Sequence, residues 1–116
     1  MEKVRNLALA LPETDEQPHF ENIAIRVKQK VFLTINAKES RATVRLTLED
    51  QDIFTRVSKG TVFPVPNKWG KYGWTHVLPD QAEPELLEDL IQTAWRTVAP
   101  PQFKKKYPEL YWEETE

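Results

Sequence analysis

The clearest structural signal in this chain is Ile23-Ala24-Ile25-Arg26-Val27-Lys28-Gln29-Lys30-Val31-Phe32-Leu33-Thr34-Ile35-Asn36. Aliphatic residues occupy every second position in both halves of this stretch, which is the period of a half-buried β-strand. Lys28-Gln29-Lys30 predicts a turn between the halves, although it lacks the glycine or asparagine typical of a tight hairpin. After a polar loop at 37–41, the same alternation returns over 43–48. Short connections predict a three-stranded antiparallel meander.

The alternation gives this predicted sheet two different faces. One face is aliphatic, with Ile23, Ile25, Val27, Val31, Leu33, Ile35, Val44, Leu46 and Leu48. The other carries Arg26, Lys28, Thr34, Thr43, Arg45 and Thr47. Residues 23–48 hold six basic side chains and one acidic side chain, whereas the whole chain has a net charge of −2. We therefore expect helices on the aliphatic face and a basic, exposed opposite face.

Helical patterns flank the meander. Residues 2–11 carry an apolar stripe that ends at Pro12, and a polar loop is expected at 13–17. Residues 48–60 predict a second helix that ends at Gly60, with Ile53, Phe54 and Val57 facing inward. The strongest pattern spans 84–98, with Pro84 at its first position and acidic residues in its first turn.

The segment between the second and third helices predicts one more strand. Residues 61–66 resemble a short edge strand because proline is confined to edges and bulges. Residues 74–78 are expected to continue this strand after a loop. Together these elements predict a single α+β domain over 1–116, an antiparallel sheet with helices packed on one face.

Composition narrows the function classes. The chain has 116 residues, 40% of them hydrophobic, and no cysteine, so disulfides and thiolate metal sites are excluded. No apolar run approaches the roughly 18 residues of a membrane span, and the charged N-terminus does not resemble a signal peptide. We expect a cytoplasmic protein without a membrane partner. The net charge of −2 disfavours nucleic-acid binding by bulk charge alone.

Catalytic and metal-binding signatures are not found in the sequence. There is no nucleophile elbow, no cysteine nucleophile and no phosphate-binding glycine loop. The two histidines, His19 and His76, lack the spacing of a metal site. We therefore expect a protein that is not an enzyme and that has no cofactor and no metal.

A second informative segment lies at Asn67-Lys68-Trp69-Gly70-Lys71-Tyr72-Gly73-Trp74, which we name the aromatic–glycine loop. Its aromatic rings could stack on bases while Lys68 and Lys71 contact phosphates. The simpler alternative is that one or both tryptophans fill the core against Trp95, with the two lysines at the surface. Both interpretations remain open from sequence.

Several motifs, in the same order, resemble the MmcQ/YjbR family. They are Leu9-Ala10-Leu11-Pro12-Glu13, Pro18-His19-Phe20, Ala24-Ile25-Arg26-Val27-Lys28-Gln29-Lys30-Val31-Phe32, Trp69-Gly70-Lys71-Tyr72-Gly73-Trp74-Thr75 and Ala94-Trp95-Arg96-Thr97-Val98-Ala99-Pro100. Gln29 and Asn22 stand where glycine is common in such proteins. The resemblance implies a compact α+β fold similar to that of CyaY, the frataxin-like arrangement. It also implies a "double wing" DNA-binding function, but no catalytic residues.

Two hypotheses for function follow. In the first, a basic sheet face and the aromatic–glycine loop bind DNA. The phosphate contacts would come from Arg26, Lys28, Lys30, Arg45, Lys68 and Lys71. In the second, the chain is a non-enzymatic module that binds a small ligand or a protein in an aromatic-lined pocket near His19, Trp69 and Trp74. A homodimer is open in either case.

Overall fold

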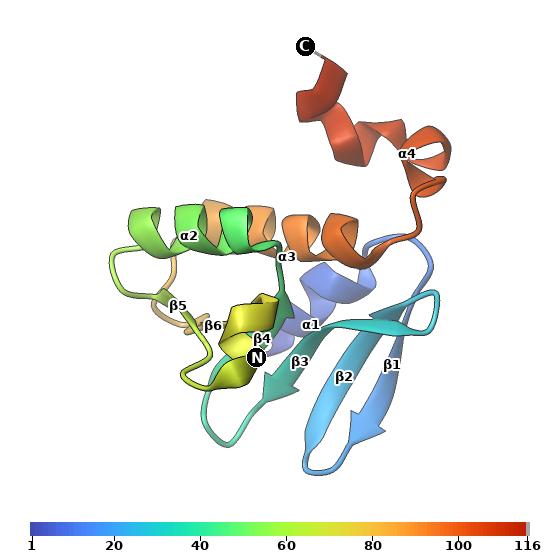
Figure 1. Ribbon diagram of the computed structural model, residues 1–116. Coiled ribbons are helices and arrows are strands. Elements are labelled where there is room, and N and C mark those ends of the chain that lie inside the picture. The colour runs from blue at the N-terminus through green and yellow to red at the C-terminus, as the bar shows by residue number, and fades with distance from the viewer. Residues whose placement is uncertain (116) are drawn as a thin grey trace.

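The meander expected over residues 23–48 forms the middle of the sheet. The computed structural model describes the backbone of residues 1–115 and the side chains of residues 1–111. The strands of the meander are β2 (Asn22–Val27), β3 (Lys30–Asn36) and β4 (Arg41–Arg45), and each is antiparallel to the next. The full sheet has six antiparallel strands in the order β1-β2-β3-β4-β6-β5 (Figure 1).

The first edge strand was not predicted. β1 (Thr14–His19) pairs with all of β2, from Thr14 opposite Val27 to His19 opposite Asn22, where a loop was expected at 13–17. This strand has no apolar alternation because it is largely exposed. Its acidic residues and Pro18 suit a sheet edge, where they discourage pairing with another chain.

The other edge was predicted only in part. β5 (Val62–Pro64) is an edge strand, as expected from its proline. β6 (Trp74–Val77) does not continue it, because β6 lies between β4 and β5 and is antiparallel to both. The loop between β5 and β6 therefore reverses the chain and acts as a long hairpin connection.

A β-bulge in β3 changes which face Val31 occupies. Ile25 lies opposite Leu33 and Arg26 lies opposite Val31, so Phe32 is one extra residue in β3. Phe32 and Leu33 are both fully buried in the core. The prediction of Val31 on the aliphatic face was wrong, because the extra residue moves Val31 to the opposite, open face of the sheet.

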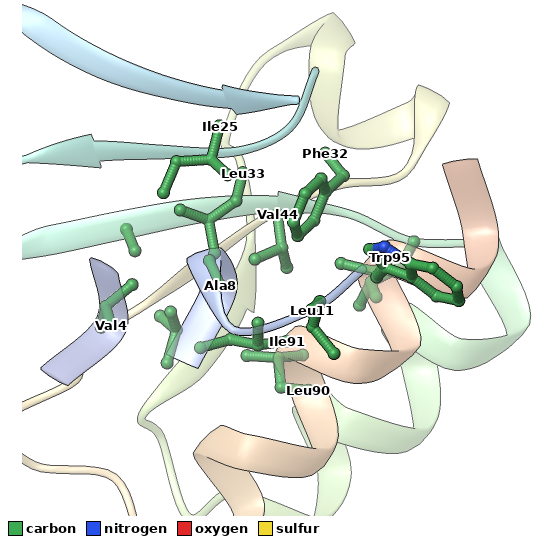
Figure 2. Packing of buried hydrophobic residues seen from close by; sticks show 14 of the residues in the cluster. Val4, Ala8, Leu11, Ile25, Phe32, Leu33, Val44, Leu90, Ile91 and Trp95 are labelled. Carbon is green, nitrogen blue, oxygen red and sulfur yellow. The ribbon is translucent and has the colours of Figure 1, made fainter. Parts of the chain in front are cut away.

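Helices cover one face of the sheet, as predicted. α1 (Glu2–Leu9) packs on α3 (Pro84–Val98), and both contact β3. Pro84 is the first residue of α3, as its fixed φ favours. Figure 2 shows Ala8, Leu33 and Ile91 meeting in the core between these layers. Burial of such aliphatic side chains is the main source of stability in a domain of this kind.

The orientation of α2 (Leu48–Val57) differs from the prediction. Phe54 is buried, but Ile53 and Val57 are more than half exposed. The buried stripe is instead Gln51 and Phe54 of α2 together with its C-cap Ser58, spaced i, i+3, i+7, and it faces the β5–β6 region. Two members of this stripe are polar, so hydrophobicity alone pointed to the wrong side of the helix.

The C-terminal segment, α4 (Phe103–Lys106) and η2 (Pro108–Thr115), packs on the end of α3. The indole of Trp95 is fully buried beside Phe103 and Tyr107, and its Nε1 donates to the carbonyl oxygen of Pro12 at 3.0 Å. Among the helices of residues 1–115, none has the length and apolar character that crossing a membrane requires.

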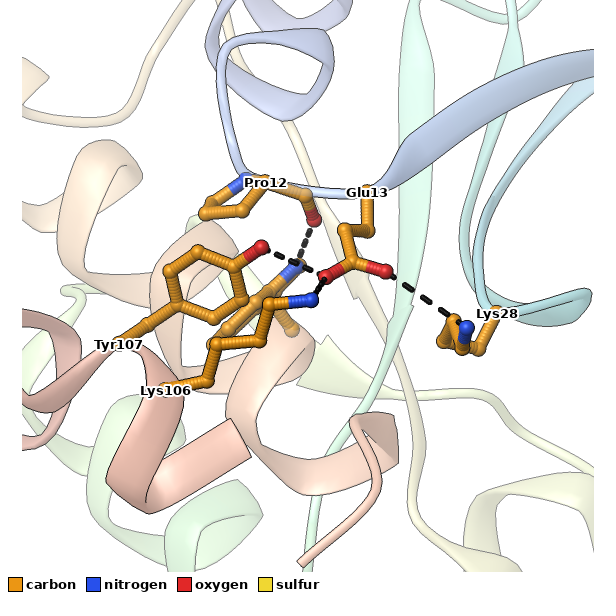
Figure 3. Close-up of polar contacts among 6 residues, drawn as sticks. Pro12, Glu13, Lys28, Lys106 and Tyr107 are labelled. Atoms are coloured by element: carbon orange, nitrogen blue, oxygen red, sulfur yellow. Dashed lines mark hydrogen bonds and ion pairs between the residues drawn. The ribbon is translucent and has the colours of Figure 1, made fainter. Parts of the chain in front are cut away.

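One acidic residue connects three distant segments. The Glu13 carboxylate accepts hydrogen bonds from Lys106 Nζ and the Tyr107 hydroxyl, each at 2.6 Å, and lies 3.6 Å from Lys28 Nζ (Figure 3). These donors lower the pKa of Glu13 to about 2, with the Lys106 hydrogen bond as the largest cause. We call Glu13, Lys28, Lys106 and Tyr107 the Glu13 clasp.

Candidate functional site

The aromatic–glycine loop folds as a short 3₁₀ helix, η1 (Lys68–Tyr72), against the sheet. Asn67 begins the helix, because its Oδ1 accepts a hydrogen bond from the Trp69 backbone N–H at 2.9 Å. Gly73 ends it with a left-handed φ of 101°. The loop thereby returns the chain directly into β6.

Both glycines of the loop lie where no side chain fits. A Cβ atom on Gly70 would lie 2.1 Å from the carbonyl oxygen of Val65, and one on Gly73 would lie 1.9 Å from that of Leu46. The Gly73 carbonyl oxygen also accepts a hydrogen bond from the Leu46 backbone N–H at 2.9 Å. The loop therefore depends on close backbone approach at these two positions.

Gln51 holds the loop from the other side. Its Nε2 lies 3.0 Å from Gly70 O, 3.2 Å from Trp74 O and 3.1 Å from Thr75 Oγ1. Sequence reasoning missed this residue, since a single glutamine in an amphipathic helix has no distinctive signature. Gly70 O and Trp74 O also accept the backbone N–H groups of Gly73 and Val65, so the buried amide adds a second donor to each.

A cavity of about 440 Å³ opens between this loop and the uncovered face of the sheet. β1, β3, β4 and β6 all contribute side chains to its walls. They are joined there by two residues of the β5–β6 connection. The lining comprises His19, Val31, Thr34, Thr43, Val65, Trp69, Trp74 and His76. We name this cavity the sheet pocket.

The strand register explains why these residues meet. Thr34 lies opposite Thr43, and Thr43 lies opposite His76, so the three form a row across β3, β4 and β6. The β3 bulge adds Val31 to the same face. Ala24, which lies opposite Thr34, is buried although it is not part of the core cluster.

Of the two interpretations left open by the sequence, the one in which Trp69 or Trp74 fills the core is wrong. Trp69 is 52% exposed, and Trp74 is partly exposed. Both line the sheet pocket, whereas Trp95 is buried beside Phe103. The 3₁₀ helix η1, Lys68–Tyr72, therefore leaves both indoles accessible on the open face of the sheet.

His76 lies in the floor of the pocket as a neutral imidazole. Its Nδ1 is 2.9 Å from the Thr43 hydroxyl, and its ring packs edge-to-face on Phe63 at 5.6 Å. Burial lowers the pKa of His76, and the nearby positive charge of Arg41 lowers it further. The floor therefore offers hydrogen bonds rather than charge at neutral pH.

The structure brings together the three residues expected in a ligand pocket, since His19, Trp69 and Trp74 share one lining. His19 comes from the end of β1, where its ring packs edge-to-face on Phe20 at 4.9 Å. Sequence reasoning did not include Thr34, Thr43 and His76. The alternation that placed Thr34 and Thr43 on the open face was the signal that could have found them.

The six expected phosphate-binding residues do not form one patch. Arg26 makes a two-pronged ion pair with Asp15 at 2.8 and 3.0 Å. Lys28 lies in the β2–β3 turn and joins the Glu13 clasp, and Lys30 follows the same turn. Figure 1 shows this turn on the side of the sheet away from η1, the yellow helix.

The other three basic residues are close to the loop. Arg45 lies over the ring of Trp74, with Cζ 5.6 Å from the centroid, and Lys68 Nζ lies 5.8 Å from the Trp69 centroid. Lys71 is exposed within η1. Among the side chains that the structure describes, those of residues 1–111, no group of three or more histidine, aspartate or glutamate residues is arranged to hold a metal ion.

Comparison with known proteins identifies the fold and the family. The chain is similar to the crystal structure of Deinococcus radiodurans protein DR2400, a DUF419 domain protein, with a TM-score of 0.73 and 20% identity over 95% of this chain and 86% of that one. Among curated proteins, none matches the sequence. The YjbR family model matches residues 9–97. This chain therefore belongs to the YjbR family.

Proposed function

We propose that the protein is a non-enzymatic binding module that holds a planar aromatic ligand in the sheet pocket. The observation that carries this proposal is the convergence of His19, Trp69 and Trp74 on one cavity. A volume of about 440 Å³ lies within the usual range of small-molecule sites. Two indoles that remain accessible, instead of packing in the core, provide flat surfaces for a ring.

The polar groups of the floor favour a ligand with hydrogen-bonding edges. Thr34 and Thr43 contribute hydroxyl groups, and His76 contributes a neutral ring whose Nδ1 is already engaged with Thr43. A few such groups in a mainly apolar lining are typical of sites that orient a small molecule. We therefore expect heteroaromatic rings to bind better than purely hydrocarbon rings of equal size.

Nuclear magnetic resonance tests this proposal. Heteroaromatic compounds should shift the indole N–H signals of Trp69 and Trp74, while that of Trp95, which donates to Pro12 O on the other side of the sheet, stays in place. Trp69→Ala should weaken binding by about 5- to 100-fold, the usual range for loss of one stacking partner. If no such compound moves the two signals, or if Trp69→Ala leaves affinity unchanged, the proposal is wrong.

A second candidate function is DNA binding through the outer side of the loop. Trp69 and Tyr72 are both more than half exposed, with ring centroids 6.1 Å apart, and Lys68 and Lys71 lie in the same helix. Exposed rings beside lysines suit stacking on unpaired bases with phosphate contacts. Arg26 and Lys28 add little, because acidic partners already neutralise them.

Fluorescence anisotropy with single-stranded and duplex DNA tests the second candidate. We expect single-stranded DNA to bind more tightly, with an affinity that falls as salt rises. The double substitution Lys68→Gln and Lys71→Gln should reduce this salt dependence, whereas the pair Lys28→Gln and Lys30→Gln should leave it unchanged. Failure to bind either DNA at low salt would exclude this function.

A further inference from the structure

Arg45 is an arginine fixed in position at the rim of the sheet pocket. Its Nε donates to the carbonyl oxygen of Tyr72 at 3.0 Å, and its guanidinium lies over the Trp74 ring. An exposed arginine normally loses considerable side-chain freedom on binding an anion. Here two contacts already restrict the side chain, so less freedom remains to be lost.

The Nη groups of Arg45 remain available. Among the described residues, Nε is the atom of this side chain that makes a hydrogen bond, and no acidic group pairs with it. These Nη groups can donate to an anion in the paired geometry that guanidinium offers to phosphate or carboxylate.

The lining of the sheet pocket carries no negative charge. None of the eight lining residues is acidic. Lys68 lies over the other indole, Trp69, and the positive charge of Arg41 acts on His76 in the floor. A pocket whose rim is cationic and whose lining contains no carboxylate favours a ligand with negative charge.

We infer that the ligand of the sheet pocket is a nucleotide, with its base against Trp69 and Trp74 and its phosphate on Arg45 and Lys68. This inference rests on the proposed pocket function and specifies its ligand. Two rim cations match the charge of a phosphate monoester better than that of a single carboxylate. The nucleotide can be free or can be one residue of a nucleic-acid strand, because both present the same base and phosphate.

Calorimetry with matched probe pairs tests this inference. The probes are adenosine and guanosine, their 5′-monophosphates, and a short single-stranded oligonucleotide. We expect each monophosphate to bind about tenfold or more tightly than its nucleoside at low salt, with a smaller ratio at higher salt. Binding of the oligonucleotide but not of free monophosphates would assign the site to a strand, and the reverse would assign it to free nucleotides.

Arg45→Gln should remove most of this preference for phosphate while nucleosides still bind. Arg56→Gln is the matched control, since Arg56 is an exposed arginine on α2 that pairs with Asp52 at 2.7 Å. Thermal unfolding and retained nucleoside affinity establish that the Arg45 variant is folded. If that variant does not fold, the nucleoside-to-nucleotide ratio of the unaltered protein and its salt dependence still decide the question.

The possible failures are distinguishable. Equal affinity for nucleosides and monophosphates would overturn the phosphate assignment and leave the pocket function standing. A phosphate preference that survives Arg45→Gln would overturn the role of Arg45. If none of the nucleosides, nucleotides or other heteroaromatic compounds binds, both the inference and the proposed function are wrong.

Discussion

The side-chain nitrogen of Gln51 lies 3.0 Å from the carbonyl oxygen of Gly70, and through this contact helix α2 holds the loop that forms one wall of the sheet pocket. The same nitrogen reaches Trp74 O and Thr75 Oγ1. An amide nitrogen has two hydrogens, so the three acceptors share them. One buried polar side chain thus links a helix, a loop and the start of β6.

Replacement of Gln51 by leucine should destabilise the protein. The substitution keeps the volume close but removes the two hydrogen bonds that the amide can donate, each contributing about 0.5–1.5 kcal/mol to the unfolding free energy. Urea denaturation measures this loss. Gln17→Leu on the exposed strand β1 serves as the control and should change stability by no more than about 0.5 kcal/mol. Equal midpoints for the two variants would contradict the role of Gln51.

Gly73→Ala should be more damaging than Gly60→Ala. Both glycines have left-handed φ values, 101° and 92°, so each alanine pays a similar conformational cost of about 1–2 kcal/mol. Only at Gly73 does the new Cβ overlap a backbone atom, Leu46 O, whereas a Cβ on Gly60 meets nothing within 4 Å. The difference between the two denaturation midpoints measures the destabilisation that the overlap causes. A smaller loss of stability for Gly73→Ala than for Gly60→Ala would refute the prediction.

The Glu13 clasp predicts a specific loss of stability in acid. The pKa of Glu13 in the folded protein is lowered to about 2, so its contribution is fully present above the ordinary value of 4.5. That contribution should decline as pH falls from about 5 towards 2, because the unfolded chain takes up the proton first. Thermal unfolding across this range should show the decline in the unaltered protein.

Glu13→Gln should flatten that part of the pH profile. The neutral amide cannot make the charged contacts with Lys106 and Lys28, so stability at neutral pH falls while the decline towards pH 2 becomes shallower. Glu39→Gln, at an exposed carboxylate in the β3–β4 turn, should retain the original profile. An unchanged slope in the Glu13 variant would show that other groups govern acid stability.

The sequence was informative where the buried face of an element is apolar throughout. The meander and α3 were predicted because one face of each is apolar, and that face is buried in the structure. β1 escaped prediction because an exposed edge strand has no buried face and so no alternation. The bulge at Phe32 was not predicted. Val31 is apolar, so the sequence pattern does not distinguish its placement on the buried face from its placement on the open face.

The site was predictable only as a set of residue types. His19, Trp69 and Trp74 were expected near one another, and they line one cavity. The loop that forms one wall of this cavity is held by the close backbone approach at Gly70 and by the hydrogen bonds of Gln51, neither of which a sequence pattern specifies. The basic residues were expected on one face, but Arg26 pairs with Asp15 of β1, the strand that was missed, and Lys28 pairs with Glu13 just before it.

The β2–β3 turn offers the last prediction. Val27 pairs with Lys30, and the two residues between them both have positive φ, 49° at Lys28 and 70° at Gln29, as in a type I′ turn. Glycine adopts this conformation without the Cβ clash that other residues suffer. Gln29→Gly should therefore stabilise the protein by about 0.5–1 kcal/mol, even though glycine loses more chain entropy on folding.

Lys38→Gly is the control, because Lys38 is also an exposed turn residue but lacks a positive φ. That control should leave stability unchanged or lower it, as measured by urea denaturation. A gain of equal size at both positions would mean that the turn conformation at Gln29 carries no strain.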